Sequence, residues 1–311
     1  MTNKIVLVTG AYGFLGRHVA RFYAQHGWHV VGIGHGDWAR EEWERWGIAE
    51  WHACDVAIDT LQTYAGEPDT IVHCAGSGSV SFSMTRPVQD FHKTVETTLS
   101  VLEFVRLYAR SAKVVYPSSA AVYGVADKFP ITEDSLLRPV SPYGVHKKIA
   151  EELCQSYSRH FGVSTSVVRF FSIYGNGLRK QVLWDACTKI SRNEITFFGA
   201  GIEMRDWLHI DDASELLFIA GKHASPDCPI VNGGYGIGIP VREVLTEIFA
   251  CFQRTDLPVF TGNVRSGDPM HYVADITLTQ AWGWSPRTDW RSGVREYVQW
   301  FKKILCREFI K

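Results

Sequence analysis

KIVLVTGAYGFLG, residues 4–16, is the stretch of sequence that decides the fold. It begins with the apolar run Lys4–Thr9, which predicts a buried strand, and it leads into the helical spacing of Phe14–Gly27. Three glycines join these elements at three-residue spacing: Gly10, Gly13 and Gly16. Such glycines let the backbone approach a phosphate, and a helix start offers free N–H groups. The stretch predicts a pyrophosphate-binding loop, with a plain strand–helix turn as the alternative because the spacing is not G-x-G-x-x-G.

The same alternation of strand and helix patterns continues through the first half of the chain. Further strands are predicted at Trp28–Ile33, Thr70–Cys74, Lys113–Tyr116 and Ser164–Phe171, and long helices at Pro87–Arg110 and Pro142–Phe161. This order predicts an α/β fold, a Rossmann-type doubly wound parallel sheet. Residues 1–175 are expected to form the cofactor-binding domain, with some C-terminal segments returning to it, and residues 176–311 a smaller C-terminal α/β substrate-binding region.

Composition excludes several classes of protein. The 311 residues are 46% hydrophobic and 21% charged, and the formal net charge is −1, so neither a nucleic-acid surface nor a basic membrane patch is expected. No apolar run is long enough to span a membrane. The seven cysteines include no C-x-x-C pair, which predicts reduced thiols. With no signal-peptide pattern before the first strand, we expect a cytoplasmic protein.

A proton-transfer site is predicted from a tyrosine and a lysine four residues apart. Tyr143 and Lys147 share one face of the helix predicted at Pro142–Phe161. Lowering a phenol pKa from about 10 to about 7 takes about 4 kcal/mol, and a lysine ammonium and an oxidised nicotinamide both act in that direction. Ser119 follows a predicted strand, where its hydroxyl can hold a reacting oxygen; a serine that caps a local turn is the alternative.

Taken together, these motifs resemble the extended short-chain dehydrogenases/reductases, in the nucleotide-sugar epimerase/dehydratase branch. The resemblance rests on the glycine loop and on segments that recur in the same order along nearly the whole chain. These are residues 72–76 (VHCAG), 118–124 (SSAAVYG), 141–147 (SPYGVHK), 169–175 (RFFSIYG), 205–212 (RDWLHIDD), 265–268 (RSGD) and 283–286 (GWSP).

The resemblance implies roles for individual residues. Tyr143 would move the proton, Ser119 would position the sugar oxygen, and Lys147 would also bind the nicotinamide ribose. The other cofactor-binding residues implied are Gly10, Tyr12, Gly13, Phe14, Leu15, Gly16, His35, Asp55, Val56, Ala75, Gly76, Ser118, Phe170 and Ser172. The substrate, a nucleotide-diphosphate sugar, would be held by Ser119, Tyr143, Ser172, Phe198, Arg205, Arg265 and Asp268, with Phe197 as a further candidate. For Asp55 the alternative is a helix cap, for the phenylalanines core packing, and for Asp268 a surface carboxylate.

Two alanines narrow the chemistry. The dehydratases of the family usually carry Asp-Glu after the active-site residue, and the branch that inverts C3 and C5 carries a cysteine there; this chain has Ala120 and Ala121. Neither side chain can transfer a proton, so redox at sugar C4 remains. A nucleotide-sugar 4-ketoreductase is the first expectation, and a 4-epimerase with tightly bound NAD is the alternative. A nucleotide sensor on the same fold is a third possibility.

The cofactor preference is predicted from the end of the second strand, where NAD-preferring relatives carry an acid. This chain has Gly34 there, with Asp37 and Arg40 beyond it, which favours NADP(H) over NAD(H) and hence the reductase. Thr94 and Ser172 stand where relatives have Asn. No metal site is expected, and the resemblance implies a homodimer through the two long helices.

Overall fold

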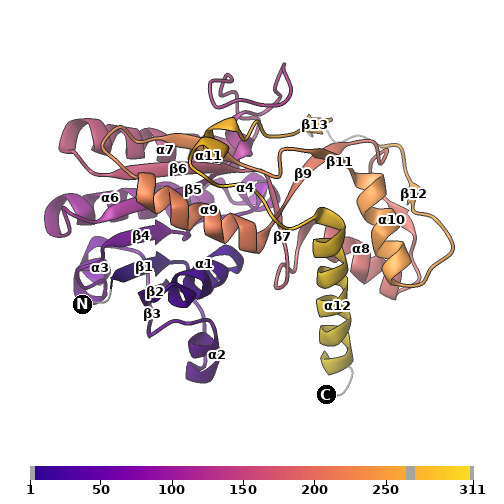
Figure 1. Cartoon of the computed structure of the whole chain (residues 1–311), viewed down its shortest axis with the longest axis horizontal. Helices are drawn as coiled ribbons and strands as arrows, with labels where there is room; N and C mark the ends of the chain where they lie inside the picture. The colour runs from indigo at the N-terminus through magenta and orange to yellow at the C-terminus, as the bar shows by residue number, and fades with distance from the viewer. Residues whose placement is uncertain (1–3, 264–269, 309–311) are drawn as a thin grey trace.

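A seven-stranded parallel sheet forms the larger part of the molecule (Figure 1). The computed structural model describes residues 4–263 and 270–308. The strands lie in the order β10-β6-β5-β4-β1-β2-β3. Their bounds are β1 (Ile5–Thr9), β2 (His29–Gly34), β3 (Glu50–Ala53), β4 (Thr70–His73), β5 (Lys113–Ser119), β6 (Thr165–Phe170) and β10 (Ile230–Gly233).

Helices cover both faces of this sheet, so the predicted Rossmann-type fold class is confirmed. One face carries α1 (Phe14–Gln25) and α9 (Ile210–His223), which pack on each other and on the strands. The other face carries α3 (Ile58–Tyr64), α6 (Thr97–Tyr108) and α7 (Pro142–Phe161). Shorter helices join these layers: α2 (Arg40–Arg45), α4 (Val80–Thr85), α5 (Pro87–Phe91) and a 3-10 turn at Ala120–Val122.

The long helix predicted at Pro87–Arg110 is present as an unbroken helical run over residues 87–108, but it contains a π-helical turn that the sequence did not predict. The segment consists of α5, a π-helix at His92–Glu96 and then α6. The hydroxyls of Thr97 and Thr98 donate to the carbonyls of Lys93 and Thr94, four residues earlier, and such bonds compete with regular helical ones. A π-turn adds one residue to the local helical repeat, a change that apolar spacing does not reveal.

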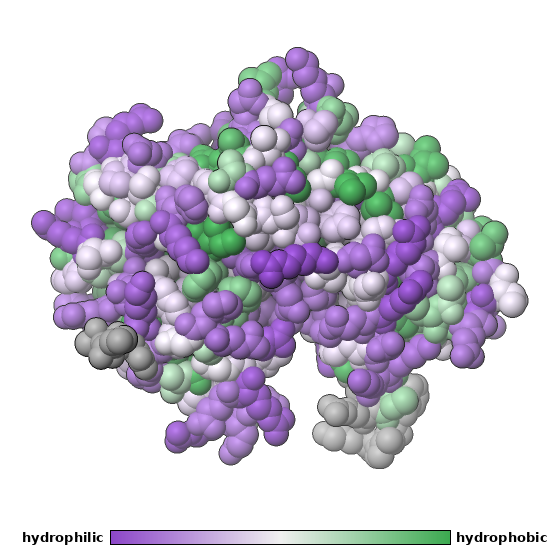
Figure 2. Space-filling model, viewed as in Figure 1, coloured by the Kyte–Doolittle hydropathy of each residue, from purple (hydrophilic) through white to green (hydrophobic). Residues whose placement is uncertain are grey.

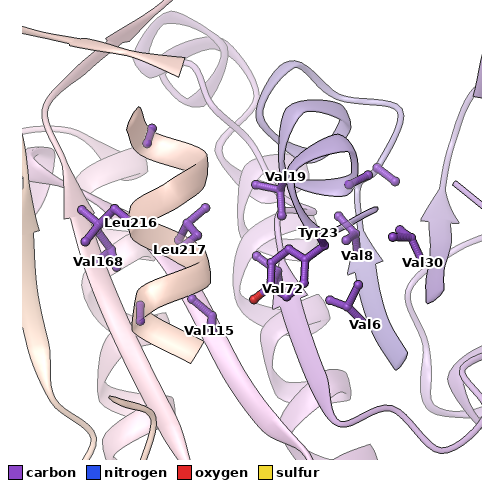
Figure 3. Close-up of a cluster of buried hydrophobic side chains, with 14 of the residues drawn as sticks. Val6, Val8, Val19, Tyr23, Val30, Val72, Val115, Val168, Leu216 and Leu217 are labelled. Atoms are coloured by element: carbon purple, nitrogen blue, oxygen red, sulfur yellow. The ribbon is translucent and has the colours of Figure 1, made fainter. Parts of the chain in front are cut away.

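The chain returns to the main sheet after residue 209. Helix α9 lies over β5 and β6, with Leu216 and Leu217 against Val115 and Val168, and Tyr23 of α1 closes the same core (Figure 3). Strand β10 then pairs in parallel with β6 at the edge of the sheet. The sheet is thus completed by residues far along the chain.

A smaller lobe stands beyond the carboxyl ends of the strands (Figure 1). Its helices enclose a separate core, which includes Trp207, Phe249 and Phe301. The helices are α8 (Gln181–Ser191), α10 (Val241–Cys251) and α12 (Trp290–Glu308), whereas the short helix α11 (Thr277–Ala281) packs against β10 of the main sheet. The short strands are β7 (Ser172–Tyr174), β8 (Thr196–Phe197), β9 (Met204–His209), β11 (Gly238–Pro240), β12 (Val259–Phe260) and β13 (His271–Tyr272).

We expect Leu217→Ala to lower the free energy of unfolding by about 3 kcal/mol, because it removes a fully buried side chain between α9 and the sheet. Leu278→Ala, at a position 46% exposed on α11, is the matched control and should cost well under half as much. Urea unfolding followed by circular dichroism measures both. Equal losses would contradict the placement of α9 in the main core.

Candidate active site

The glycine loop between β1 and α1 is shaped for close approach by a ligand. Gly10 has φ +66°, and a Cβ there would lie 2.6 Å from the backbone nitrogen of Ala75. A Cβ on Gly16 would lie 2.3 Å from the Gly10 carbonyl oxygen, so both positions need glycine. Gly13 caps α1 without any side-chain hydrogen bond, and no acidic residue occupies the first turn. The N–H groups of that turn therefore suit a pyrophosphate, so the loop fits a dinucleotide.

The ends of β2 and β3 bring His35 and Asp55 together. Nε2 of His35 lies 2.7 Å from Oδ1 of Asp55, and both side chains are mostly exposed. Gly34 has φ +157°, and a Cβ there would meet Gly10 at 3.3 Å and the ring of Trp51 at 3.5 Å. The backbone conformation at position 34 is therefore one that residues with a side chain rarely adopt, and a Cβ there would contact Gly10 tightly. Asp55 follows β3, not β2, but it lies beside His35 and so supplies a carboxylate near the end of β2.

The loop after β4 is held by two threonine hydroxyls. Oγ1 of Thr9 accepts from the N–H of Ala75 at 3.2 Å, and Oγ1 of Thr94 accepts from the N–H of Ser77 at 3.4 Å. Thr94 comes from the π-helix and is buried. A threonine in the place of the expected Asn therefore still holds this loop. Gly76, with φ +135°, lies between the two anchored residues.

Ser119, Tyr143 and Lys147 meet at the carboxyl end of β5. Ser119 is the last residue of that strand; its hydroxyl accepts from the N–H of Ala121 at 3.2 Å and also acts to lower the pKa of the Tyr143 phenol. The capping role and the positioning role thus coexist. Nζ of Lys147 donates to the Pro117 carbonyl at 2.9 Å and lies 4.7 Å from the ring centre of Tyr116.

The sequence predicted that the pKa of the Tyr143 phenol would be lowered. The protein alone raises it instead. Burial raises that pKa, the hydrogen bond from Ser119 lowers it, and the charge of Asp90 raises it. Burial also lowers the pKa of Lys147 to about 8. Lys147 therefore stays mostly protonated at neutral pH, but its ammonium does not offset the effect of burial on the pKa of Tyr143. A positively charged ring bound beside the phenol would lower the pKa of Tyr143.

A buried polar network lies directly behind this site. The Ser118 hydroxyl donates to Glu151 at 2.5 Å, and Glu151 accepts from Arg169 at 2.8–3.2 Å. Arg169 also donates to the hydroxyl of Tyr123, which donates to Asn232 at 2.7 Å. The Ser118 side chain therefore points into the interior, and only its backbone is left for a cofactor.

Sequence comparison identifies the family. A family model described as "NAD dependent epimerase/dehydratase family" matches residues 6–234. The chain belongs to this family. It is therefore an NAD(P)-binding enzyme of the oxidoreductase/epimerase type, as the sequence motifs predict.

Relatives of this family member cover nearly its whole length. A UDP-glucose 4-epimerase of Corynebacterium glutamicum is 30% identical, over 94% of each chain. A CDP-paratose 2-epimerase of Salmonella typhi is 28% identical, over 96% of this chain and 99% of its own.

Solved structures of UDP-glucose 4-epimerases are similar to this chain over nearly its whole length. A UDP-glucose 4-epimerase of Thermotoga maritima with UDP-glucose has a TM-score of 0.87 at 25% identity, over 97% of this chain and 99% of its own. One of Brucella ovis with NAD has a TM-score of 0.85 at 26% identity, over 96% of this chain and 98% of its own.

The predicted substrate residues of this family member are only partly described. Ser172 is half-buried at the start of β7, and Arg205 is half-buried on β9 beside it. Phe198 is 42% exposed, whereas Phe197 packs in the core of the smaller lobe. Arg265 and Asp268 lie outside the described residues.

The remaining cofactor candidates occupy different environments. Val56 and Phe170 are buried, and Tyr12, Phe14 and Leu15 line the glycine loop, with Tyr12 39% exposed.

Tyr272 on β13 is a site neighbour that the sequence did not indicate. Its hydroxyl donates to the Ala120 carbonyl, and the charge of Tyr143 acts on its pKa. No local pattern marks it, because it reaches the site only through the fold.

A groove on the outer surface lies apart from the proton-transfer site. A groove of about 510 Å³ opens near Arg17, Trp46 and Trp300, where Figure 2 shows a notch in the outline, and it does not include Tyr143. Over residues 4–263 and 270–308 there is no group of three potential metal ligands. In the same part of the chain, every helix is too short or too polar to cross a membrane.

Glu151→Gln should lower the free energy of unfolding by about 3 kcal/mol, because it leaves the buried guanidinium of Arg169 without a counter-charge. Glu44→Gln, which removes a solvent-exposed partner of Arg40, should change it by no more than about 0.5 kcal/mol. Thermal and urea unfolding would measure both, and similar losses would show that the buried pair is not specially important.

Proposed function

We propose that this enzyme is a nucleotide-sugar 4-epimerase that keeps NAD bound through the reaction. The observation that carries the proposal is the set at the end of β5. Ser119 and Tyr143 face one another there, and Ala120 and Ala121 follow Ser119 with no group able to remove water. The site can therefore move one proton and support one hydride transfer, and nothing in it favours elimination.

The residues would act as follows. Ser119 holds the sugar hydroxyl oxygen, Tyr143 takes its proton, and Lys147 binds the nicotinamide ribose. The cofactor supplies an acceptor that takes a hydride from the sugar carbon and returns it. Tyr143 then gives the proton back to the same oxygen after the keto-sugar has presented its other face. Arg205 and Arg265 would hold the diphosphate, for which a guanidinium is well shaped.

The epimerase is favoured over the reductase that the sequence first suggested. That preference depended on the missing acid at Gly34, which pointed to NADP(H). The carboxylate of Asp55, held by His35 at 2.7 Å, stands at the same edge and would disfavour a 2′-phosphate. The similar proteins described above include 4-epimerases, and the similar structure from Brucella ovis contains NAD. The CDP-paratose 2-epimerase is the reason for testing sugars that differ at C2 as well.

The purified protein should carry NAD and interconvert UDP-glucose and UDP-galactose, or the matching uronates, without added cofactor. Tyr143→Phe should lower turnover by about 10²–10⁴-fold, because it removes the proton carrier. Chromatography of the sugars and of the cofactor released on denaturation measures both effects.

Tyr64→Phe, at a half-exposed tyrosine on α3, is the control and should leave turnover unchanged. Protein free of cofactor that consumes NADPH on a 4-keto-sugar would instead establish the reductase. A full rate in Tyr143→Phe would exclude both versions. A wild-type protein that binds the nucleotide but converts no sugar would favour the nucleotide sensor.

We also propose a homodimer through α5, α6 and α7. Exposed apolar side chains follow this surface at Val88, Leu99, Val145 and Phe161, each at least 40% exposed. Leu99→Glu should convert the dimer into a monomer, because it places a charge in the apolar contact. Light scattering after size-exclusion chromatography measures the mass; Leu257→Glu, on an exposed loop of the smaller lobe, is the control. A monomeric wild-type protein would contradict the proposal.

We propose a cytoplasmic location as well. All seven cysteines are free thiols in the structure, which suits a reducing compartment.

A further inference from the structure

A buried carboxylate and a histidine lie beside the proton-transfer site. Oδ2 of Asp90 is 2.5 Å from Nδ1 of His146, Asp90 is fully buried, and His146 is 9% exposed. The other oxygen of Asp90 has no hydrogen-bond partner among the described residues. Phe91 packs edge-on against the imidazole at 5.4 Å. Burying a carboxylate costs folding free energy unless it is paired and hydrogen-bonded. A buried carboxylate with one unpaired oxygen at this position therefore calls for an explanation.

The pair joins α5 to the first turns of α7. His146 lies three residues after Tyr143 and one before Lys147, so any shift of its turn moves both side chains. A second contact from the same side supports this turn: the N–H of Tyr143 donates to the Ser83 hydroxyl of α4 at 3.0 Å. The start of α7 is thus fixed by one neutral contact and one ionisable contact.

Asp90 is the carboxylate that acts on both residues. Its charge raises the pKa of Tyr143 and that of Lys147. The other titratable groups that interact with these two residues are Cys74 and His73 from β4 and the loop after it, Tyr116 from β5, Glu151 and Cys154 from α7, and Tyr272 from β13. Glu151 forms a buried ion pair with Arg169, whereas the Asp90 side chain hydrogen-bonds His146 alone among the described residues.

We propose that Asp90 and His146 are a positioning pair for the reaction. They hold the first turns of α7 on α5, and the negative charge of Asp90 opposes the loss of the Tyr143 proton until a positive ring is bound. This inference rests on the proposed role of Tyr143 as the proton carrier. The pair does not touch the sugar; it acts through Tyr143 and Lys147.

Two conservative variants separate charge from packing. Asp90→Asn keeps an acceptor for the imidazole and removes the charge, so Tyr143 should lose its proton at a pH about one unit lower. His146→Gln keeps a donor for the carboxylate and leaves its charge in place, so this titration should not move to lower pH. Asp185→Asn, an exposed carboxylate on α8, makes the same change in net charge far from the site.

The experiment is a tyrosinate titration of the cofactor-loaded protein by near-ultraviolet absorbance. The signal of Tyr143 is taken as the difference from the same variant carrying Tyr143→Phe. No sugar is needed, so a wrong substrate or a failed epimerase assay leaves this measurement intact. With an active substrate, the acid limb of the kcat profile should follow the titration, while KM stays within about twofold.

The downward shift in Asp90→Asn, absent from His146→Gln and Asp185→Asn, supports the proposal. An unshifted titration in a folded Asp90→Asn protein overturns it, and so does an equal downward shift in His146→Gln, since loosening rather than charge would then be responsible. If Asp90→Asn does not fold, the double variant with His146→Gln pairs two amides without charge, and it must show the same downward shift.

Discussion

The ion pair between Glu151 and Arg169 fixes helix α7 on strands β5 and β6, and the site depends on that placement. Glu151 stands one turn after Lys147 on α7, and Arg169 belongs to β6. Both side chains are nearly inaccessible to solvent, at 2% and 4% exposure. Because Ser118 also donates to Glu151, the pair fixes the end of β5 as well. Ser119 and Tyr143 are thereby placed on two elements held by one buried contact.

A buried ion pair of this kind fixes the position of α7 on the sheet more than it adds to the free energy of unfolding. The desolvation of two ions costs several kcal/mol, and good geometry returns about that amount, so an apolar replacement can be equally stable. An apolar replacement would let α7 slide or rotate on the sheet, since dispersion contacts are weakly directional. The bidentate geometry of Arg169 on Glu151 permits only one register. A proton-transfer site that needs a phenol and a hydroxyl within hydrogen-bond reach benefits from that restriction.

Local sequence patterns predicted those parts of the molecule whose geometry is local. The run into Gly10–Gly16 reveals a strand, a loop and a helix, and the four-residue spacing of Tyr143 and Lys147 reveals a shared helix face. Pairings between distant segments were not predictable in the same way. The contact of β10 with β6 and the meeting of His35 with Asp55 join residues with no periodic relation. The π-turn at His92–Glu96 was not predicted, because apolar spacing over a long helix does not reveal one wider turn within it.

The raised pKa of Tyr143 has a consequence for how proton and hydride are coupled. A phenol that the protein keeps neutral gives up its proton readily only while a positive charge stands beside it. Oxidised nicotinamide carries that charge and its reduced form does not. Tyr143 would therefore be populated as the phenolate, which accepts a proton, while the oxidised ring is bound, and as the neutral phenol, which donates one, once the ring is reduced. The proposed oxidation followed by reduction at one carbon requires that order. A site with a permanently lowered pKa would favour the first step and hinder the return. Burial, together with the negative charge of Asp90, would make the pKa of Tyr143 depend on the state of the cofactor. The proposed epimerisation, which runs in both directions on one bound cofactor, would need that dependence.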